Sequence, residues 1–599
     1  MKNIKQLWNY LKGNRSRYFG ALISIGLATL FSLAAPLIIK TTIDSVIGDK
    51  ELQAPKVIQD VIVSIGGVEA LKDKLWIPAI IIVAFAIIRG IFLYFKGKWS
   101  AEAAEAVAKT IRDQVYDHLQ YLSYDYHVKA ETGDLIQRCT SDVEIIRRFL
   151  ATQSIEIGSA LFMLLFTIYI MVPMDATLTI ISMSLIPVIF VFTVVFFVKV
   201  KEAFKLMEEA EGKMSSTLQE NLTGLRVVRA FGRQAYEVDK FDEKNIVNRD
   251  LTYKLIRLFA WYWSVSDLLS MIQMGIVLTT SVYWTYTGRI TLGTMVVFNT
   301  YVGMLLWPIR QLGRVITDLG KAMVSLDRIG EILAEKKEKM EEKGENPKIK
   351  GNISFKNVTF EYEKGKPVLN DISFDVKEGK TVAILGPTGA GKTTLVHLLA
   401  RLFDYQKGSI KIDGIELKEI DKKWIRKNVG LILQEPFLFA RTIKDNIKLG
   451  RVEAEDEEVF NVAKVAAIHD VVLDFDKGYE TLVGERGVSL SGGQKQRLAI
   501  SRSLIINCPI IVFDDSLSAV DTETDAAIRS ALKKRRNKAT TFIISHRIAT
   551  ISEADIILVL EKGRIVEIGN HNELISNNGL YNRIWKLQNL ESNILEKSS

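Results

Sequence analysis

The stretch "TVAILGPTGAGKTTLVHLLARLF" spans Thr381–Phe403 and decides the fold of the second half of the chain. Its centre, Gly386 to Thr393, fits G-x-x-x-x-G-K-[ST], with a β-branched strand pattern before it and a helical pattern after it. In such a loop, backbone N–H groups close around phosphate, and the amino end of the helix adds positive potential. Lys392 reaches the outer phosphates and the Thr393 hydroxyl can ligate Mg²⁺. The stretch therefore predicts an α/β nucleotide-binding domain.

Length and composition indicate that this domain is only part of the molecule. The chain has 599 residues, more than one domain requires, and 48% of them are hydrophobic, which favours membrane spans. The 78 basic and 70 acidic side chains fit a membrane protein with cationic cytoplasmic loops, so no nucleic-acid partner is expected. The two cysteines, Cys139 and Cys508, are too few and too distant for a disulfide framework or a metal cluster, and we expect both to be small buried residues.

Six apolar runs are long enough, at about 18 residues or more, to cross a bilayer as helices. The runs are Tyr18–Ile39, Leu75–Phe95, Ile157–Met174, Ala176–Val198, Leu268–Gly288 and Ile290–Ile309. The second run carries one charge, Arg89, which we expect to snorkel to the near interface rather than face an internal cavity. Met1–Arg17 contains five Lys or Arg and no acid, so the positive-inside rule places the amino terminus in the cytoplasm.

The connections between the runs support this count. Residues 174–175 and 288–289 form tight turns outside, where loop 41–74 also lies, whereas the long charged stretches 96–156 and 199–267 are expected to be cytoplasmic helices. A charged linker with helix breakers follows the sixth run. The expected domains are a transmembrane domain with cytoplasmic loops at 1–333, a linker at 334–350 and a nucleotide-binding domain at 351–590.

A second motif separates the many kinds of nucleotide-binding protein. In "VSLSGGQKQRLAISRSLI" (Val488–Ile505) the sequence resembles the ATP-binding cassette (ABC) family, whose signature LSGGQ stands at Leu490–Gln494. Six spans followed by one cassette is similar to a half-transporter of the bacterial multidrug exporter type. The resemblance implies ATP-driven export of an amphipathic drug-like or lipid substrate by alternating access. It also implies a multi-pass protein of the bacterial cell (inner) membrane, with a cytoplasmic cassette.

The resemblance implies roles for residues outside the phosphate loop. Tyr362 is similar to the aromatic residue on which adenine stacks, and Gln434 to the Q-loop residue that contacts Mg²⁺ and responds to the membrane domain. Asp514 resembles the Walker B ligand of Mg²⁺, His546 the switch histidine, and Ser518–Asp521 the D-loop. Singly, each has an ordinary alternative, such as an edge-strand aromatic, a hydrogen-bonded polar residue or a helix cap. Their order and spacing disfavour those alternatives.

The candidate site residues fall into three groups. The catalytic group is Asp515, His546 and Gln434. The metal ligands are Thr393, Gln434 and Asp514. The nucleotide-binding group is Tyr362, Gly386, Gly389, Gly391, Lys392, Thr393, Thr394, Ser491, Gly492, Gly493 and Gln494.

The resemblance also implies a partner, because in this family the signature of one cassette closes on the nucleotide held by another. Ser491 and Gly492 would then bond the γ-phosphate of the partner's ATP. Residues 123–146 and 220–241 look like the family's two cytoplasmic loops with coupling helices. They would dock on the cassettes, the second on the partner's, and transmit cassette closure to the spans.

The residue after Asp514 departs from the family pattern, because glutamate usually stands where this chain has Asp515. Aspartate is one methylene shorter, so its carboxylate falls about 1.5 Å short, and a misplacement of about 1 Å can cost ~100-fold in rate. Similar replacements mark the degenerate site of heterodimeric ABC exporters, which favours a heterodimer. A homodimer with a slow site stays open, because degenerate chains often lose the switch histidine and His546 is present.

The substrate is the least defined part of the prediction. Candidate cavity residues are Arg89, Asp267, Trp263 and Trp307, although aromatic residues near span ends are more often part of an interfacial belt. Asp267 fits a cytoplasmic-interface position as well as a cavity. An apolar lining would suit amphipathic drugs or lipids. The alternative function is an ATP-gated passive pore or a regulatory membrane protein.

Overall fold

The computed structural model describes residues 2–48, 71–72, 74–338, 344–484, 487, 489–516, 522–534 and 539–598. It forms two compact units. The first comprises Met1–Gln120 and Glu131–Glu335, and the second comprises Tyr121–Ala130 and Lys336–Ser599. The sequence-based division did not assign residues 121–130 to the second unit. The domain limits 1–333, 334–350 and 351–590 stay predictions.

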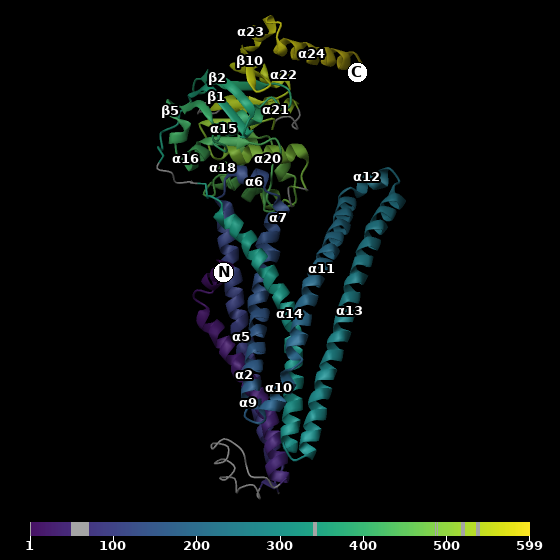
Figure 1. Cartoon of the computed structure of the whole chain (residues 1–599). Helices are drawn as coiled ribbons and strands as arrows, with labels where there is room; N and C mark the ends of the chain where they lie inside the picture. Colours follow the sequence, from purple (N-terminus) through teal and green to yellow (C-terminus); the bar gives the residue numbers. More distant parts are fainter. Residues whose placement is uncertain are drawn as a thin grey trace. The chain divides into compact units, whose positions relative to one another are not determined.

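The first unit is helical throughout its described part (Figure 1). Its elements are α1 (Lys2–Tyr10), α2 (Arg15–Thr41), η1 (Thr42–Ile47), α5 (Trp76–Gln120), α7 (Thr132–Gln137), η2 (Arg138–Asp142), α8 (Val143–Arg148), η3 (Phe149–Gln153), α9 (Ser154–Met171), α10 (Ala176–Met183), α11 (Ile186–Thr223), α12 (Leu225–Ala230), α13 (Gln234–Tyr286) and α14 (Leu292–Ala334).

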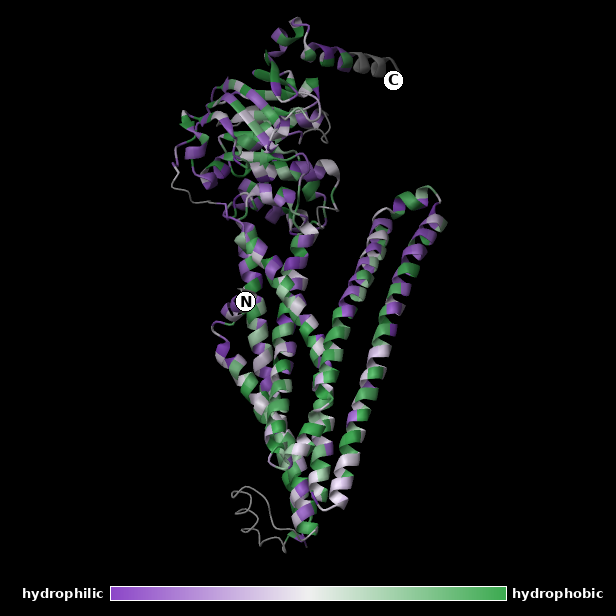
Figure 2. Ribbon diagram, viewed as in Figure 1, coloured by the Kyte–Doolittle hydropathy of each residue, from purple (hydrophilic) through white to green (hydrophobic). Residues whose placement is uncertain are grey.

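Within the described residues, six helical segments are long and apolar enough to cross a membrane, which confirms the predicted number of spans. They are Arg15–Ile47, Trp76–Gln120, Thr132–Met171, Ala176–Thr223, Gln234–Tyr286 and Leu292–Ala334. Each is longer than the ~20 residues that a bilayer needs, so the helices continue beyond the membrane. Figure 2 shows the change along α11 and α13, where hydrophilic residues become frequent toward α12.

The α-helix of the fourth span is interrupted, although the apolar run in the sequence continues without a break. Between α10 and α11, Ser184 and Leu185 leave the α-helix, and Pro187 follows in the first turn of α11. Proline lacks a backbone N–H and fits the start of a helix, so it marks the restart. Farther along, α11 packs closely on α14 at Gly313. A methyl group there would lie 2.5 Å from Phe197 Cδ2 and also too close to Thr193 Cγ2.

The second unit contains two sheets (Figure 1). The antiparallel sheet has the order β2 (Lys366–Val376), β1 (Ile353–Glu363), β4 (Lys407–Ile412) and β5 (Ile415–Glu416). The other sheet has the order β10 (Arg564–Gly569), β9 (Ile556–Glu561), β3 (Thr381–Leu385), β8 (Thr540–Ile544), β7 (Ile510–Asp514) and β6 (Val429–Ile432), and all of its pairs except β10–β9 are parallel.

Helices complete the second unit. They are α6 (Tyr124–Lys129), α15 (Lys392–Leu399), η4 (Leu417–Glu419), α16 (Lys422–Asn428), α17 (Ile443–Lys448), α18 (Asp456–Val465), α19 (His469–Leu473), η5 (Gly478–Glu480), α20 (Gly492–Leu504), α21 (Thr522–Lys534), α22 (Ile548–Ile551), α23 (His571–Ser576) and α24 (Leu580–Ser598).

The parallel sheet positions the candidate site. Strands β3, β7 and β8 are almost fully buried, as their apolar and β-branched residues predict for a sheet covered on both faces. In register, Asp514 of β7 lies opposite Ile544 of β8, and Ile544 opposite Ile384 of β3. The loops that leave these strands therefore share one edge of the sheet, where open α/β sheets bind ligands.

Candidate functional site

The loop between β3 and α15 has the backbone that phosphate binding needs. Gly389 and Gly391 adopt φ values of +80° and +95°, which favour glycine, and a methyl group on Gly391 would lie 2.7 Å from Leu369 Cδ2. The Lys392 ammonium donates to the carbonyl oxygens of Gly386 at 2.8 Å and Pro387 at 3.0 Å. The lysine therefore lies folded over its own loop.

Burial lowers the pKa of Lys392, and the negative charges of Asp515 and Asp514 oppose that effect. The two carboxylates thus favour the ammonium form inside a desolvated loop. A triphosphate placed there would favour it further, because opposite charges raise the pKa of an amine.

Thr393 and Asp514 come together across the sheet. The Thr393 hydroxyl donates to Asp514 Oδ1 at 3.0 Å, although 120 residues separate them in the sequence. Asp514 is buried at the end of β7, and burial raises the pKa of its carboxyl, with Asp515 adding to the rise and Thr393 and Lys392 opposing it. A hydroxyl and a carboxylate at one point, with Gln434 nearby, supply the oxygen donors that Mg²⁺ prefers. The residues present therefore fit that ion.

Asp515 lies in an unusual backbone conformation. Its φ of +45° is left-handed, and its N–H donates to the carbonyl oxygen of Ile544 at 3.1 Å. Gln434 Nε2 donates to Asp515 Oδ2 at 3.4 Å, a long bond that brings the Q-loop residue to the carboxylate. Burial raises the pKa of Asp515, whereas the nearby His546, Lys392 and Arg547 lower it. The catalytic candidates Asp515, Gln434 and His546 thus share one neighbourhood.

Tyr362 lies at the phosphate loop from another direction. Tyr362 is the penultimate residue of β1, and 37% of its surface is exposed. Its hydroxyl lies 3.0 Å from Thr394 Oγ1. The ring packs edge-on against Phe360 and Phe403, with centroids 4.8 and 5.0 Å away. The ring is held by neighbours and partly accessible, as a base-stacking platform must be.

The signature residues form a separate group. Ser491 caps α20: its hydroxyl accepts from the Gln494 N–H at 3.3 Å, and its own N–H donates to Gln494 Oε1 at 2.8 Å. A side chain on Gly492 would meet open space. In the described part of the cassette, no hydrogen bond or ion pair joins Ser491–Gln494 to Lys392, Thr393 or Asp514. The predicted D-loop, Ser518–Asp521, lies outside the described residues.

Comparison with known proteins decides the family. A profile described as "ABC transporter transmembrane region" matches residues 18–309, and one described as "ABC transporter" matches residues 369–518. YgaD of Bacillus subtilis (strain 168), named as a multidrug export ATP-binding/permease protein, is 33% identical over 593 residues, 98% of this chain and 99% of the relative. The chain belongs to the ABC transporter family. The predicted family is confirmed.

Further similarities agree with this assignment. YknU, an ABC transporter ATP-binding protein of the same organism, is 32% identical over 595 residues, 98% of each chain. A solved bacterial Atm1-family ABC exporter with ATP bound superposes with a TM-score of 0.77 at 28% identity, covering 96% of this chain and 99% of that one. The protein is therefore a multi-pass ABC exporter of the half-transporter type, with an ATPase coupled to transport.

The membrane unit of this ABC exporter brings together three of the four candidate cavity residues. Asp267 Oδ1 lies 2.7 Å from Arg310 Nη1, Trp263 lies under the same guanidinium at 4.8 Å, and Trp307 stacks on Trp263 at 5.8 Å. The Arg310 side chain is only 9% exposed. Arg89 is exposed and lies on a different helix, α5. Sequence reasoning missed Arg310, which follows the last apolar run directly.

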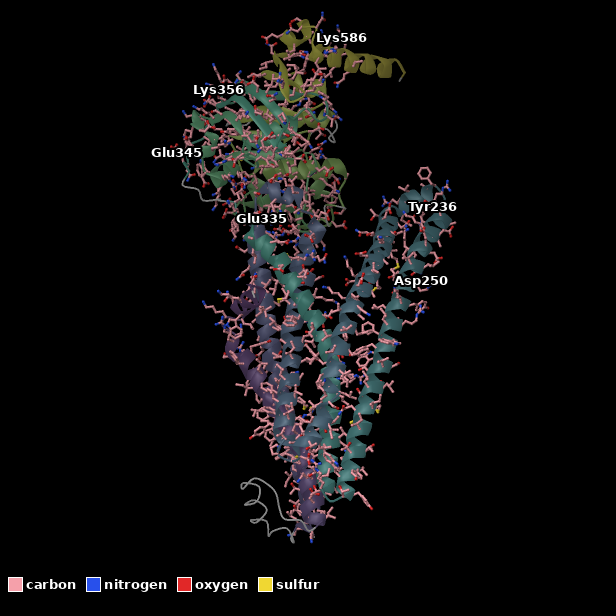
Figure 3. All side chains as sticks on the ribbon, in the orientation of Figure 1. Tyr236, Asp250, Glu335, Glu345, Lys356 and Lys586 are labelled. Atoms are coloured by element: carbon pink, nitrogen blue, oxygen red, sulfur yellow. The ribbon has the colours of Figure 1, made fainter. Side chains whose placement is uncertain are left out.

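The hairpin formed by α11, α12 and α13 ends in exposed apolar side chains. Val227 is 60% exposed, Phe231 76% and Tyr236 60%. Figure 3 labels Tyr236 at this end of the hairpin. With Arg233 and Glu237, they line a hollow of about 480 Å³. These residues lie within the segment 220–241 that resembles the family's second coupling loop. An apolar surface on an otherwise polar hairpin end is typical of an interaction site.

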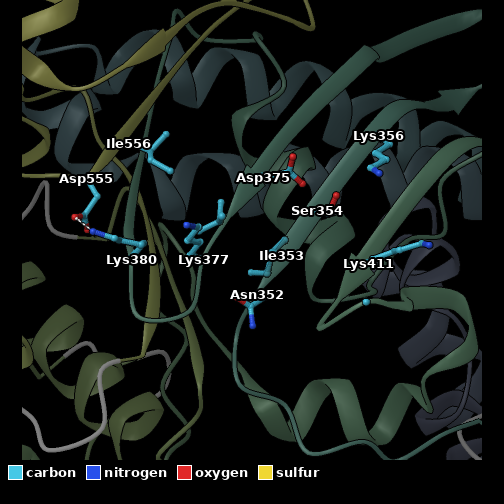
Figure 4. Close-up of a pocket in the computed structure, with 12 residues that line it drawn as sticks. Asn352, Ile353, Ser354, Lys356, Asp375, Lys377, Lys380, Lys411, Asp555 and Ile556 are labelled. Carbon is cyan, nitrogen blue, oxygen red and sulfur yellow. Dashed lines mark hydrogen bonds and ion pairs between the residues drawn. The ribbon is translucent and has the colours of Figure 1, made fainter.

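The cassette has a hollow of about 550 Å³ (Figure 4). It is lined by Lys356, Lys377, Lys380 and Lys411, and Lys380 pairs with Asp555 at 2.7 Å. Lys380 and Asp555 directly precede β3 and β9, so this hollow lies at the amino ends of the parallel strands. The phosphate loop leaves the carboxyl end of β3, at the opposite edge of the sheet.

Proposed function

We propose that this chain uses ATP at paired cassettes to export an amphipathic drug-like or lipid substrate by alternating access. The observation that carries the proposal is the assembly of Lys392, Thr393 and Asp514 at one sheet edge, in a chain that also supplies six spans. Lys392 would bind the outer phosphates, and Thr393, Asp514 and Gln434 would hold Mg²⁺. When bound, Mg²⁺ neutralises charge on the β- and γ-phosphates.

We infer that Asp515 orients the attacking water less well than the usual glutamate, so this chain's own Walker site turns over slowly. Gln434 contacts the Asp515 carboxylate at 3.4 Å, which supports a joint role at the γ-phosphate. His546 lies close enough to Asp515 to lower the pKa of that carboxyl, which supports its place beside the γ-phosphate. Tyr362 stacks on the adenine, and Ser491–Gln494 complete the partner's site.

The partner is a second half-transporter, and a heterodimer is favoured over a homodimer by Asp515. The exposed Val227, Phe231 and Tyr236 support a partner, because such a surface requires a cover. The basic residues of Met1–Arg17 support a cytoplasmic amino terminus and cassette in a bacterial inner membrane.

Uphill transport tests the proposal. The chain and its partner half are reconstituted in vesicles with the dye Hoechst 33342 or a fluorescent phospholipid. We expect ATP to build a concentration gradient that collapses in the Lys392→Ala variant. Flux that only equalises the concentrations would refute export and establish a gated passive pore instead.

A further inference from the structure

The short helix α6 belongs to the cassette unit, although the sequence places it between the second and third spans. Ser123 caps it by accepting from the Tyr126 N–H at 3.3 Å, which fixes the direction in which the helix starts. The ring of Tyr124 lies edge-on to two cassette rings, Phe403 with a centroid distance of 5.4 Å and His397 at 6.0 Å. The side chain of Tyr124 thus joins the coupling loop to two rings of the cassette.

The same Phe403 contacts the adenine-stacking candidate. Its ring lies 5.0 Å from that of Tyr362 at an interplanar angle of 82°. Edge-to-face rings attract each other in a limited range of orientations. A rotation of one ring therefore changes the favoured orientation of the next. A continuous series of contacts therefore runs from Tyr362 through Phe403 to Tyr124.

A second contact reaches the phosphate loop. His397 and Thr394 lie one turn apart on α15, the helix that begins at Lys392. Thr394 Oγ1 bonds the Tyr362 hydroxyl at 3.0 Å, and His397 contacts both Tyr124 and Phe403. Burial lowers the pKa of His397, so the ring that Tyr124 touches is a neutral one. Tyr124 therefore lies against the elements that hold both the base and the phosphates.

We propose that Tyr124 is a positioning residue that makes the membrane domain respond to the nucleobase as well as to the triphosphate. A base stacked on Tyr362 fixes that ring, and with it Phe403 and Tyr124, so α6 takes one defined position. A triphosphate without a base engages Lys392 and Thr393 but leaves Tyr362 unstacked. Hydrolysis at the γ-phosphate then proceeds without the full signal to the spans. The inference rests on the proposed nucleotide site.

The test compares two ligands with the same phosphates, Mg-ATP and Mg-tripolyphosphate, each at saturation. The response of the spans is the distance between spin labels at Ile47→Cys and Tyr286→Cys, exposed residues near the outer ends of the first and fifth spans, with Cys139 and Cys508 replaced by serine. Labelled chain is diluted into unlabelled assembly in lipid. We expect ATP to shift the distance distribution at least ~5-fold more than tripolyphosphate, the lower end of typical allosteric coupling.

Variants of the aromatic series identify the route. In Tyr124→Leu the response to ATP should fall to that of tripolyphosphate, with the ATP hydrolysis rate and KM of the basal reaction retained. Tyr124→Phe keeps the ring and should behave as wild type. Tyr126→Leu, on the same helix with its ring beside His127 at 5.8 Å, is the matched control. Phe403→Leu breaks the series from the cassette side and should reproduce Tyr124→Leu.

Two outcomes would overturn the inference: a wild-type response equal for both ligands, or a full ATP response in both Tyr124→Leu and Phe403→Leu. The export assay is read separately. An ATP-specific response of the spans without uphill transport would support the inference and refute export alone.

Discussion

At Asp515, the backbone conformation and the reach of the side chain favour different residues. Its φ of +45° is tolerated better by aspartate and asparagine than by most side chains, so the local backbone suits aspartate. Under the proposed mechanism a longer carboxylate would suit the reaction better, because it would have to reach the attacking water from the end of β7. The Asp515 carboxylate accepts a long hydrogen bond of 3.4 Å from Gln434 Nε2. Backbone preference and catalytic reach therefore oppose each other here.

Lengthening this side chain tests the conflict. Asp515→Glu should accelerate hydrolysis at this chain's own Walker site by about 10- to 100-fold, because the carboxylate moves toward the water. Single-turnover hydrolysis of labelled ATP by the reconstituted assembly measures it. Asp515→Asn, which keeps the backbone preference and loses the charge, should give no acceleration. An unchanged rate in Asp515→Glu would locate the defect in the signature that completes this site.

His397 gives the cassette a pH-dependent stability. Its pKa lies below the ordinary value near 6.5, so below that pH the unfolded chain binds a proton that the folded chain does not. Stability should therefore fall as the pH drops from about 7 to about 5. His397→Asn should flatten this dependence in thermal melts of the whole chain, whereas His127→Asn, at an exposed histidine of α6, should not. Equal slopes in wild type and His397→Asn would contradict the prediction.

Helix packing in the membrane unit depends on Gly313 of α14. Its hydrogen faces Thr193 and Phe197 of α11 with no room for a methyl group, as expected where spans approach through small residues. Gly313→Ala should destabilise the unit by ~1–3 kcal/mol through overpacking. Gly320, two turns later on the same helix, faces open space, so Gly320→Ala should stabilise by ~0.5–1 kcal/mol through helix propensity. Thermal unfolding in one detergent compares the pair, and equal effects would rule out close packing as the cause.

Elements were predictable where one property determines them. Hydropathy alone located the six spans, and the β-branched run before the phosphate loop located β3, because burial on both faces demands apolar residues throughout. The break at Ser184 and Leu185 was not predicted, because apolar side chains conceal a change of backbone hydrogen bonding. The expected burial of both cysteines holds for Cys508 only, since Cys139 is partly exposed on η2.

The motifs predicted some contacts of the candidate site and missed others. Motif spacing placed Lys392, Thr393 and Asp514 together, and the Thr393–Asp514 hydrogen bond agrees with that placement. The contacts of Tyr124 with His397 and Phe403 were not predicted, because they join segments more than 270 positions apart that carry no joint motif. Arg310 was missed for a similar reason, since its pairing with Asp267 depends on how α13 and α14 pack.

In the whole transporter, the signature of this chain and its Walker motifs should contribute unequally to ATP hydrolysis. In a heterodimer, this chain's LSGGQ completes the partner's site, and its own Walker motifs form the slower one. Gly492→Glu should therefore abolish ATPase activity and transport, because an acid would face the partner's γ-phosphate. The open space around Gly492 accommodates the side chain, so the fold should survive.

Asp515→Asn in this chain only should reduce the ATPase rate much less. ATPase measurements on the reconstituted pair, with each change confined to this chain, give the comparison. In a homodimer every site contains both residues, so equal collapse from both changes would refute the degenerate assignment of Asp515.

The seat of α6 in the cassette unit has a consequence for biosynthesis. Residues 121–130 leave the ribosome long before Phe403 and His397, and at ~5–20 residues per second the delay is on the order of tens of seconds. During that time Tyr124 has no aromatic pocket to enter, and the emerging cassette must find a segment already threaded between two membrane helices. A cassette expressed alone would lack Tyr124. The rings of Phe403 and His397 would then lose their contacts with it, and this pocket would stay open. Correct assembly is thus completed only after translation of the cassette, and it depends on the insertion machinery leaving that short helix within reach.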